Sequence, residues 1–505
     1  MIQDQNQMEA EELFSKELWL DHVGSKIEDI AGKPFLKFIV TRKAPVYTHA
    51  LQRVQTALSE DNPFKGRIDV EPTDKPTSFP ESIEASILDG MISRTSRAEA
   101  ETSVHGIGFI PFHNREENKV IQPANHLILG RRGVGKSTLI GKAVEVLRKR
   151  KNLCVVIGFQ AYAHRDDLTI IDDLFIDILD ELDKELGTRG TKSENIRQKI
   201  AALSLQIKSR KLNTQAAILE VKHVLKEATS AFATDFFLFL DDFHLISQSI
   251  QPKVIAALHG AVKGARGWLK IAGLTTLVRY YDQANRTGLQ VPGDAQIIPL
   301  DLTLTDPQAA ETHLRSILSN YLMQVGIQHV SSVIRDAPFR RLVWANAGVV
   351  RDFLQMFSIA LVSARRAKRS LVALSDVNLS IGELGKQKMS DLEQDGRNES
   401  DTLKQCLNAL GDFCLNKAKI NAFLVKQETS DLSKMIQTLS DLRVVHLLHQ
   451  SITPHKAGER YEAHMLDYSS FVGFRRKRNI REIHPKHGLQ FQVKELRKLP
   501  VFRAA

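Results

Sequence analysis

The sequence has few cysteines and no long apolar run. Its three cysteines, Cys154, Cys406 and Cys414, form no C-x-x-C pair, so a disulfide framework or a thiol zinc site has no support. A membrane-spanning helix needs about 20 apolar residues, whereas the longest uninterrupted apolar runs here, such as Phe236–Leu240, are much shorter. The first residues are acidic rather than basic and apolar, unlike a secretion signal. These absences predict a cytoplasmic protein without a membrane partner.

The size and charge of the chain are those of a multidomain protein with one basic end. It has 505 residues, of which 43% are hydrophobic and 25% are charged, which excludes collagen-like and wholly disordered classes. The net charge is +10, and residues 471–505 hold ten Lys or Arg against two Glu. Such a concentration of cations is typical of a surface that meets phosphates. The alternative is a solvated tail.

The middle of the chain alternates short apolar runs with long helical patterns. The runs, each expected to be a strand, are His126–Leu129, Leu153–Ile157, Phe236–Leu240, Leu269–Ala272 and Gln296–Leu300. Strands that alternate with helices predict an α/β fold, with a parallel sheet in a three-layer core.

The flanking regions have different patterns. Four prolines between Glu60 and Pro80 indicate a linker. Residues 305–386 have helical spacing without a convincing strand, and a later helical stretch at Ser433–Leu448 precedes two short strands, which suggests a winged helix. We therefore expect four domains: an accessory region of unknown fold (1–100), a core domain with the parallel sheet (101–304), a helical domain that follows it as a lid (305–390) and a winged-helix-like domain with a basic end (391–505).

The strongest motif follows the first of the five predicted strands. It matches G-x-x-x-x-G-K-S/T, and a helical pattern comes directly after it. Glycine lets backbone N–H groups turn toward a phosphate, Lys136 neutralises phosphate oxygens, and the Ser137 hydroxyl is a ligand for Mg²⁺. The predicted nucleotide-binding residues are Gly130, Arg131, Arg132, Gly133, Val134, Gly135, Lys136, Ser137 and Thr138.

A second motif ends the third predicted strand. Asp241 and Asp242 follow the apolar run, and a carboxylate at that edge of a parallel sheet can hold the Mg²⁺ hydration shell while its neighbour activates water. The alternative is a strand that simply reaches solvent. No guanine-reading Asn-Lys-x-Asp element occurs, so the expected cofactors are ATP and Mg²⁺.

The order of these motifs resembles AAA+ and STAND ATPases, and among them the origin-recognition-like branch with a lid and a winged helix. The resemblance implies that Thr275 or Thr276 is sensor 1, that Arg351 in Ala347–Arg351 is sensor 2, and that Arg286 is an arginine finger supplied to a neighbouring subunit. It also implies a homo-oligomer when ATP is bound. Arg279 is a rival to Arg286. The alternatives to these roles are a helix cap for the threonines, a solvated helix-surface arginine for Arg351 and an ordinary loop arginine for Arg286.

The expected DNA reader is the winged helix, because a helix fits the major groove while wing cations grip phosphates. A recognition helix within Ser433–Leu448 would be joined by basic residues of the wing and the tail: Lys456, Arg460, Arg475, Arg476, Lys477 and Arg478. These features predict an ATPase that acts as a nucleotide-dependent switch on double-stranded DNA or a DNA-bound complex. Two alternatives are a STAND-type signalling or defence scaffold with protein partners, and a nucleotide-binding protein without turnover.

Overall fold

The computed structural model divides the chain into two compact units. Among the described residues, those of 111–301 form one unit, here called the core unit, and those of 2–95, 109–110 and 302–503 form the other, the composite unit. The structure describes residues 2–73, 77–95, 109–395, 400–428, 430–454, 459–472, 479–483 and 491–503.

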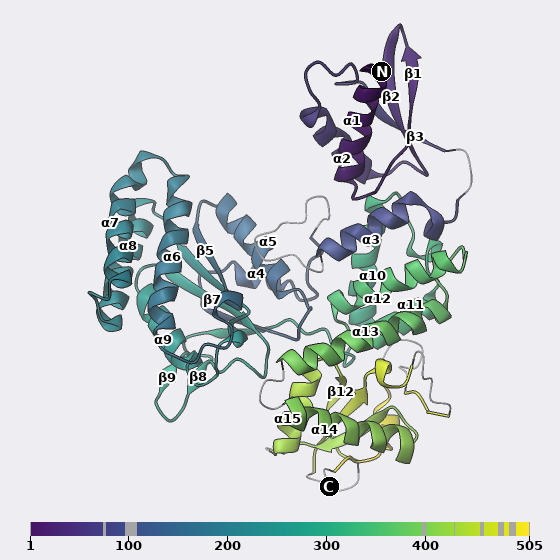
Figure 1. The fold of residues 1–505 in the computed structure, drawn as a ribbon. Helices are drawn as coiled ribbons and strands as arrows, with labels where there is room; N and C mark the ends of the chain where they lie inside the picture. Colours follow the sequence, from purple (N-terminus) through teal and green to yellow (C-terminus); the bar gives the residue numbers. More distant parts are fainter. Residues whose placement is uncertain are drawn as a thin grey trace. The chain divides into compact units, whose positions relative to one another are not determined.

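The core unit is built on a five-stranded sheet (Figure 1). All of its pairings are parallel, and the strand order is β10-β4-β7-β6-β5. Its elements are α4 (Glu116–Val120), β4 (His126–Leu129), α5 (Lys136–Lys149), β5 (Leu153–Gly158), α6 (Ile170–Gly187), α7 (Glu194–Lys208), α8 (Thr214–Ala231), β6 (Phe236–Asp241), α9 (Gln251–Val262), β7 (Gly267–Gly273), β8 (Tyr281–Asp282), β9 (Thr287–Gly288) and β10 (Gln296–Pro299).

Both faces of this sheet are buried. Phe236, Leu238 and Leu240 of β6 pack in one cluster with helices α6 to α9. Phe237 and Phe239 point to the opposite face and are buried as well. The five strands expected from the sequence and the α/β three-layer core are therefore confirmed.

The amino-terminal region, whose fold the sequence did not reveal, contains α1 (Ile2–Glu17), β1 (Ser25–Ile30), β2 (Lys33–Val40), α2 (Pro45–Ala57) and β3 (Ile68–Pro72). The strands form one sheet of order β1-β2-β3. The expectation of a plain linker at 60–80 is wrong, because β3 lies inside it and pairs parallel with β2.

Helices follow on both sides of the core unit in sequence. They are α3 (Ile83–Thr95), α10 (Pro307–Gln324), α11 (Asp336–Asn346), α12 (Val350–Arg366) and α13 (Leu374–Asp395). Although α3 falls in the predicted accessory region, it is joined to the lid helices: Ser358 is hydrogen-bonded to Asp89, and the Tyr321 hydroxyl donates to Thr95 at 2.7 Å. The four expected domain ranges remain a prediction. None of the helices that the structure describes is long and apolar enough to cross a membrane.

The carboxyl-terminal region contains α14 (Ser400–Gly411), β11 (Ala422–Lys426), α15 (Asp431–Asp441), β12 (Val445–Ile452), β13 (Tyr461–Leu466) and α16 (Val493–Leu496). Its sheet has the order β11-β13-β12 and is antiparallel. Helix, strand, helix and hairpin follow one another as expected for a winged helix. One boundary was wrong: the helix predicted over Ser433–Leu448 ends at Asp441, and β12 begins at Val445.

A buried ionic cluster joins the lid helices to this region. Lys388 of α13 lies 2.7 Å from Asp467 and 3.5 Å from Asp352 of α12. Asp352 also pairs with Arg443, and His446 of β12 lies 2.7 Å from Asp467. All five groups are buried. Two carboxylates are thus balanced by two permanent cations, which is the condition for keeping such charges out of water.

Candidate functional site

The phosphate-binding loop of the core unit connects β4 to α5. Its backbone has φ +81° at Gly133 and +103° at Gly135, a region that favours glycine. A Cβ at Gly130 would lie 3.0 Å from the Val134 side chain. Val134 is buried, Arg132 and Ser137 are half-buried, and Thr138 is exposed. The loop therefore has tight local packing and leads directly into the positive end of a 14-residue helix.

Lys136 is the first residue of α5 and is buried. Its ammonium donates to the carbonyl oxygens of Gly130 and Arg131 at 2.8 and 2.9 Å. A buried ammonium requires such acceptors. These carbonyls belong to the loop that would hold the phosphates, so the cation lies at this loop.

Ser137 and Asp241 meet at the carboxyl edge of the sheet. The Ser137 side chain lies near enough to the Asp241 carboxylate to lower its pKa, and Asp241 is 5% exposed. Burial, together with the negative charge of Asp242, raises the pKa of Asp241 to about 6, although Ser137 and Lys136 oppose the rise. A hydroxyl beside a carboxylate is an oxygen donor set that suits Mg²⁺. The residues present therefore fit the expected metal.

Asp242, the expected water-activating carboxylate, lies just beyond β6 with φ +55°. Its Oδ2 accepts a hydrogen bond of 2.7 Å from the Gln160 side-chain amide. Gln160 was not among the predicted site residues, and no sequence pattern marks it. It lies two residues beyond Gly158, which is opposite Asp241 only because β5 pairs with β6.

The sensor 1 candidates follow β7, which lies between β4 and β6. The backbone N–H of Gly130 donates to the Gly273 carbonyl at 3.3 Å, so the end of β7 adjoins the start of the phosphate-binding loop. Thr275 is exposed and Thr276 is half-buried in the turn beyond this point. The Thr276 carbonyl accepts from Gln248 at 3.2 Å. The turn is thus at the expected edge of the sheet.

The finger candidates lie in and near the β8–β9 hairpin. Arg279 pairs with Asp282 at 3.1 Å. Arg286 is exposed in the turn of the hairpin and has φ +51°. Both arginines are exposed, which suits a residue that acts on another subunit, and the finger role of Arg286 remains a prediction with Arg279 as its rival.

Arg351 belongs to the composite unit. It is half-buried in the first turn of α12, three residues after Gly348, whose φ is +86°. The sensor 2 role implied by the resemblance remains a prediction.

The nucleic-acid candidates fall mostly outside the described residues, as is the case for Lys456, Arg475, Arg476, Lys477 and Arg478. Arg460 is described and exposed, just before β13. Helix α15, the expected reader, carries one cation, Lys434, which lies 3.5 Å from Asp431, and it ends at Asp441. Because phosphate affinity requires excess positive charge, any DNA affinity of this region would depend on the wing and the tail rather than on α15.

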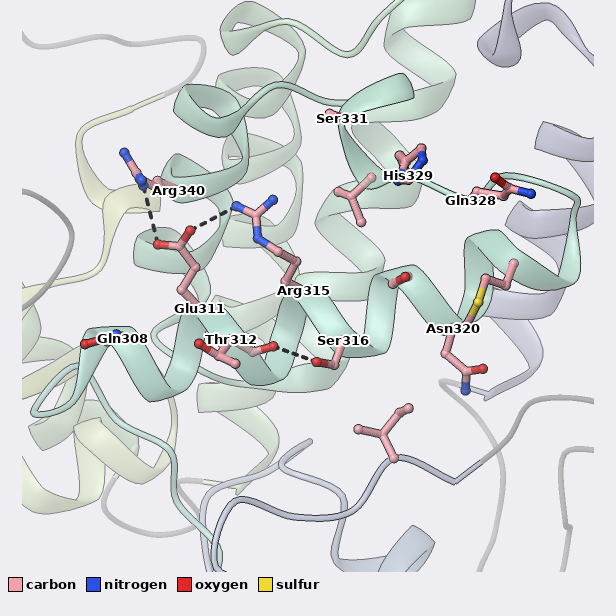
Figure 2. A pocket seen from close by; sticks show the side chains of 14 residues that line it. Gln308, Glu311, Thr312, Arg315, Ser316, Asn320, Gln328, His329, Ser331 and Arg340 are labelled. Carbon is pink, nitrogen blue, oxygen red and sulfur yellow. Dashed lines mark hydrogen bonds and ion pairs between the residues drawn. The ribbon is translucent and has the colours of Figure 1, made fainter.

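A polar pocket of about 800 Å³ lies along α10 in the composite unit (Figure 2). Two arginines line it, and both contact one carboxylate: Glu311 lies 2.9 Å from Arg315 and 3.4 Å from Arg340. Arg315 also lies over the Phe339 ring at 4.2 Å. These pairings neutralise much of the positive charge, so the pocket is a weaker candidate for phosphate binding than the loop before α5.

The fold and the phosphate-binding loop before α5 define the class of protein. The core is that of a P-loop NTPase, with a glycine-rich loop after the strand β4 and an acidic strand end at β6. No family model matches the chain, and no curated protein matches it.

Among solved structures, the chain is similar to Cdc6 and origin-recognition proteins. Cdc6p from Pyrobaculum aerophilum is 13% identical, with a TM-score of 0.36 over 74% of this chain and 94% of that one. Drosophila ORC bound to DNA is 12% identical, with a TM-score of 0.38 over 84% and 97%. Aeropyrum pernix ORC1 in complex with DNA is 14% identical, with a TM-score of 0.36 over 71% and 90%. The resemblance expected from the sequence is found again among these structures. The strand order and the motifs of the chain itself define its fold.

Proposed function

We propose that the protein binds ATP with Mg²⁺ at the loop before α5 and hydrolyses it. The observation that carries this proposal is that carbonyls of the phosphate-binding loop hold Lys136, while the Ser137 side chain lies near enough to the buried Asp241 carboxylate to lower its pKa. A phosphate-binding cation and an oxygen donor pair for a divalent metal thus adjoin one sheet edge, as phosphoryl transfer requires.

Each residue has a distinct part in this proposal. Lys136 exchanges the Gly130 and Arg131 carbonyls for phosphate oxygens, while Ser137 and Asp241 hold the metal. Mg²⁺, when bound with the nucleotide, neutralises charge on the phosphate oxygens.

Asp242 accepts a proton from the attacking water. Asp242 must first lose its hydrogen bond to Gln160, because the Gln160 amide occupies one of the Asp242 carboxylate oxygens. Thr275 or Thr276 orients the water or the γ-phosphate, and Arg351 contacts the γ-phosphate from the lid.

We further propose that this cycle acts as a switch on double-stranded DNA or a DNA-bound complex. The support is the concentration of cations in residues 471–505 together with a winged-helix order of elements before it. ATP hydrolysis should be measured with and without duplex DNA across a salt series, with Lys136→Ala as the blank. Stimulation that fades with salt supports the DNA switch, because phosphate contacts release counterions, whereas hydrolysis indifferent to DNA contradicts it.

The alternative is a scaffold of STAND type whose assembly is controlled by ATP. The exposed position of Arg286 and a folded amino-terminal region with its own sheet favour protein contacts. Arg286→Ala and Lys136→Ala proteins, each inactive alone, should regain hydrolysis when mixed, because one supplies the nucleotide site and the other the arginine. Light scattering with and without ATP checks the assembly. If mixing restores no hydrolysis and the Arg286→Ala protein alone is as active as wild type, Arg286 does not act on a neighbouring subunit.

A further inference from the structure

Asp301 and Leu302 are consecutive residues that contact two different functional segments. Asp301 is the last residue of the core unit, and Leu302 begins a segment of the composite unit. The contacts of each residue lie within its own unit, and the peptide bond between them joins the two sets of contacts.

Asp301 holds the first peptide of the phosphate-binding loop. One carboxylate oxygen accepts from the Arg131 backbone N–H and from the Arg131 Nε, both at 3.0 Å. The carbonyl of that same peptide, Gly130 O, accepts from Lys136 at 2.8 Å. Asp301 therefore fixes the orientation of the peptide plane that holds Lys136. The Arg131 side chain is 4% exposed, so this charge-assisted contact is largely removed from water.

Leu302 holds the turn before α12. A Cβ on Gly348 would lie 1.9 Å from the Leu302 carbonyl oxygen, so the backbone of this turn packs directly on the backbone of Leu302. The φ of +86° at Gly348 also favours glycine. Arg351 follows in the first turn of α12, so a shift of Leu302 must move the turn that precedes Arg351.

We propose that Asp301 is a positioning residue for the phosphate-binding loop and that Asp301 and Leu302 couple this loop to Arg351. The proposal rests on the proposed function, since it assumes that both segments meet the nucleotide. Occupancy of the loop then biases the position of Arg351, and by linkage Arg351 biases the affinity of the loop. In this proposal the signal passes through the peptide bond that joins the two residues.

The test measures binding of fluorescent ATP and ADP analogues to the full chain. Replacing Asp301 alone would release a cation near the phosphates and could tighten binding for that reason, so the informative variant is Asp301→Asn with Arg131→Gln, which keeps the net charge. Losing charge-assisted bonds should weaken ATP binding by about tenfold or more. Asp235→Asn with Arg266→Gln is the matched control. The two residues lie 3.1 Å apart in the same unit, but they precede the strands β6 and β7, whereas the phosphate-binding loop follows a strand. This variant should bind ATP as wild type does.

Coupling is tested by adding Arg351→Ala to each background. In wild type this substitution should abolish the preference for ATP over ADP, whereas in the Asp301/Arg131 variant it should change little. Equal effects in both backgrounds overturn the coupling, and wild-type affinity in the Asp301/Arg131 variant overturns the positioning role.

Two checks separate these results from unfolding of a variant and from failure of the proposed function. Thermal unfolding is recorded for every variant; should the pair variant unfold, Asp301→Asn alone serves instead, and coupling then requires a smaller Arg351→Ala effect there than in wild type. If wild type and the control pair variant bind neither nucleotide, the proposed function itself fails, and this inference fails with it.

Discussion

Replacing Asp241 by Asn should stabilise the protein in the absence of nucleotide while impairing its use of Mg²⁺. Burial and the charge of Asp242 raise the pKa of Asp241 from an ordinary 3.8 to about 6. At neutral pH the folded state therefore carries a carboxylate that its surroundings disfavour. Asn retains an oxygen that can accept from Ser137 but has no charge.

The magnitude follows from the linkage between pKa and stability. Moving a pKa from 3.8 to about 6 corresponds to about 3 kcal/mol, which we treat as an upper figure. The folded state binds the proton more tightly than the unfolded state, so the cost of the charge develops as pH rises from 3.8 to 6. The advantage of Asp241→Asn should be complete above pH 6 and should vanish near pH 4, where Asp241 is itself protonated.

The assay is chemical denaturation at a series of pH values between 4 and 8, without nucleotide, beside Mg²⁺-dependent binding of an ATP analogue. Asp242→Asn is the control: it keeps the buried carboxylate but removes the neighbouring charge, so it should lower the pKa of Asp241 and give a smaller gain. An Asp241→Asn protein that is less stable than wild type above pH 6, or whose ATP binding responds to Mg²⁺ as wild type does, would refute the reasoning.

The remaining predictions concern the hydrogen bond to Asp242 and the ionic cluster. Gln160→Ala should free Asp242 and raise kcat for ATP by about twofold to tenfold with KM little changed, measured by steady-state kinetics; an unchanged or lower kcat contradicts the restraint. Lys388→Met should leave Asp467 buried without its cation and cost about 3–5 kcal/mol in the free energy of unfolding. Lys386→Met, on the same helix but exposed, should cost under about 1 kcal/mol, and equal losses would count against the cluster.

Much of the nucleotide site was predictable because it depends on short stretches of chain. A strand, a glycine-rich turn and a helix follow one another within residues 126–149, and the positive φ values of the loop are met by its own glycines. Likewise, an apolar run that ends in two carboxylates places Asp241 at a sheet edge wherever that strand lies in the sheet. The site residues implied by resemblance alone, such as Arg351, had no comparable local basis.

Some elements were wrong because distant pairing decided them. The sequence Val445–Leu448 continues the helical spacing of α15, yet it belongs to β12, which pairs with β13. In the same way Ile68–Pro72 lies among prolines, but β2 supplies a partner and makes it a strand. Backbone hydrogen bonds to a remote segment outweighed the local preference in both places.

The sequence by itself determined the phosphate-binding loop, the acidic strand end and the α/β core, since these follow from local backbone freedom and apolar patterning. Only the tertiary structure decided that Gln160 holds Asp242, that Asp301 holds Arg131, and that α3 joins the lid helices. Asp301 is 170 residues from Arg131 and Gln160 is 82 from Asp242. No local pattern marks such pairs, because only folding brings together groups that are so far apart in the sequence.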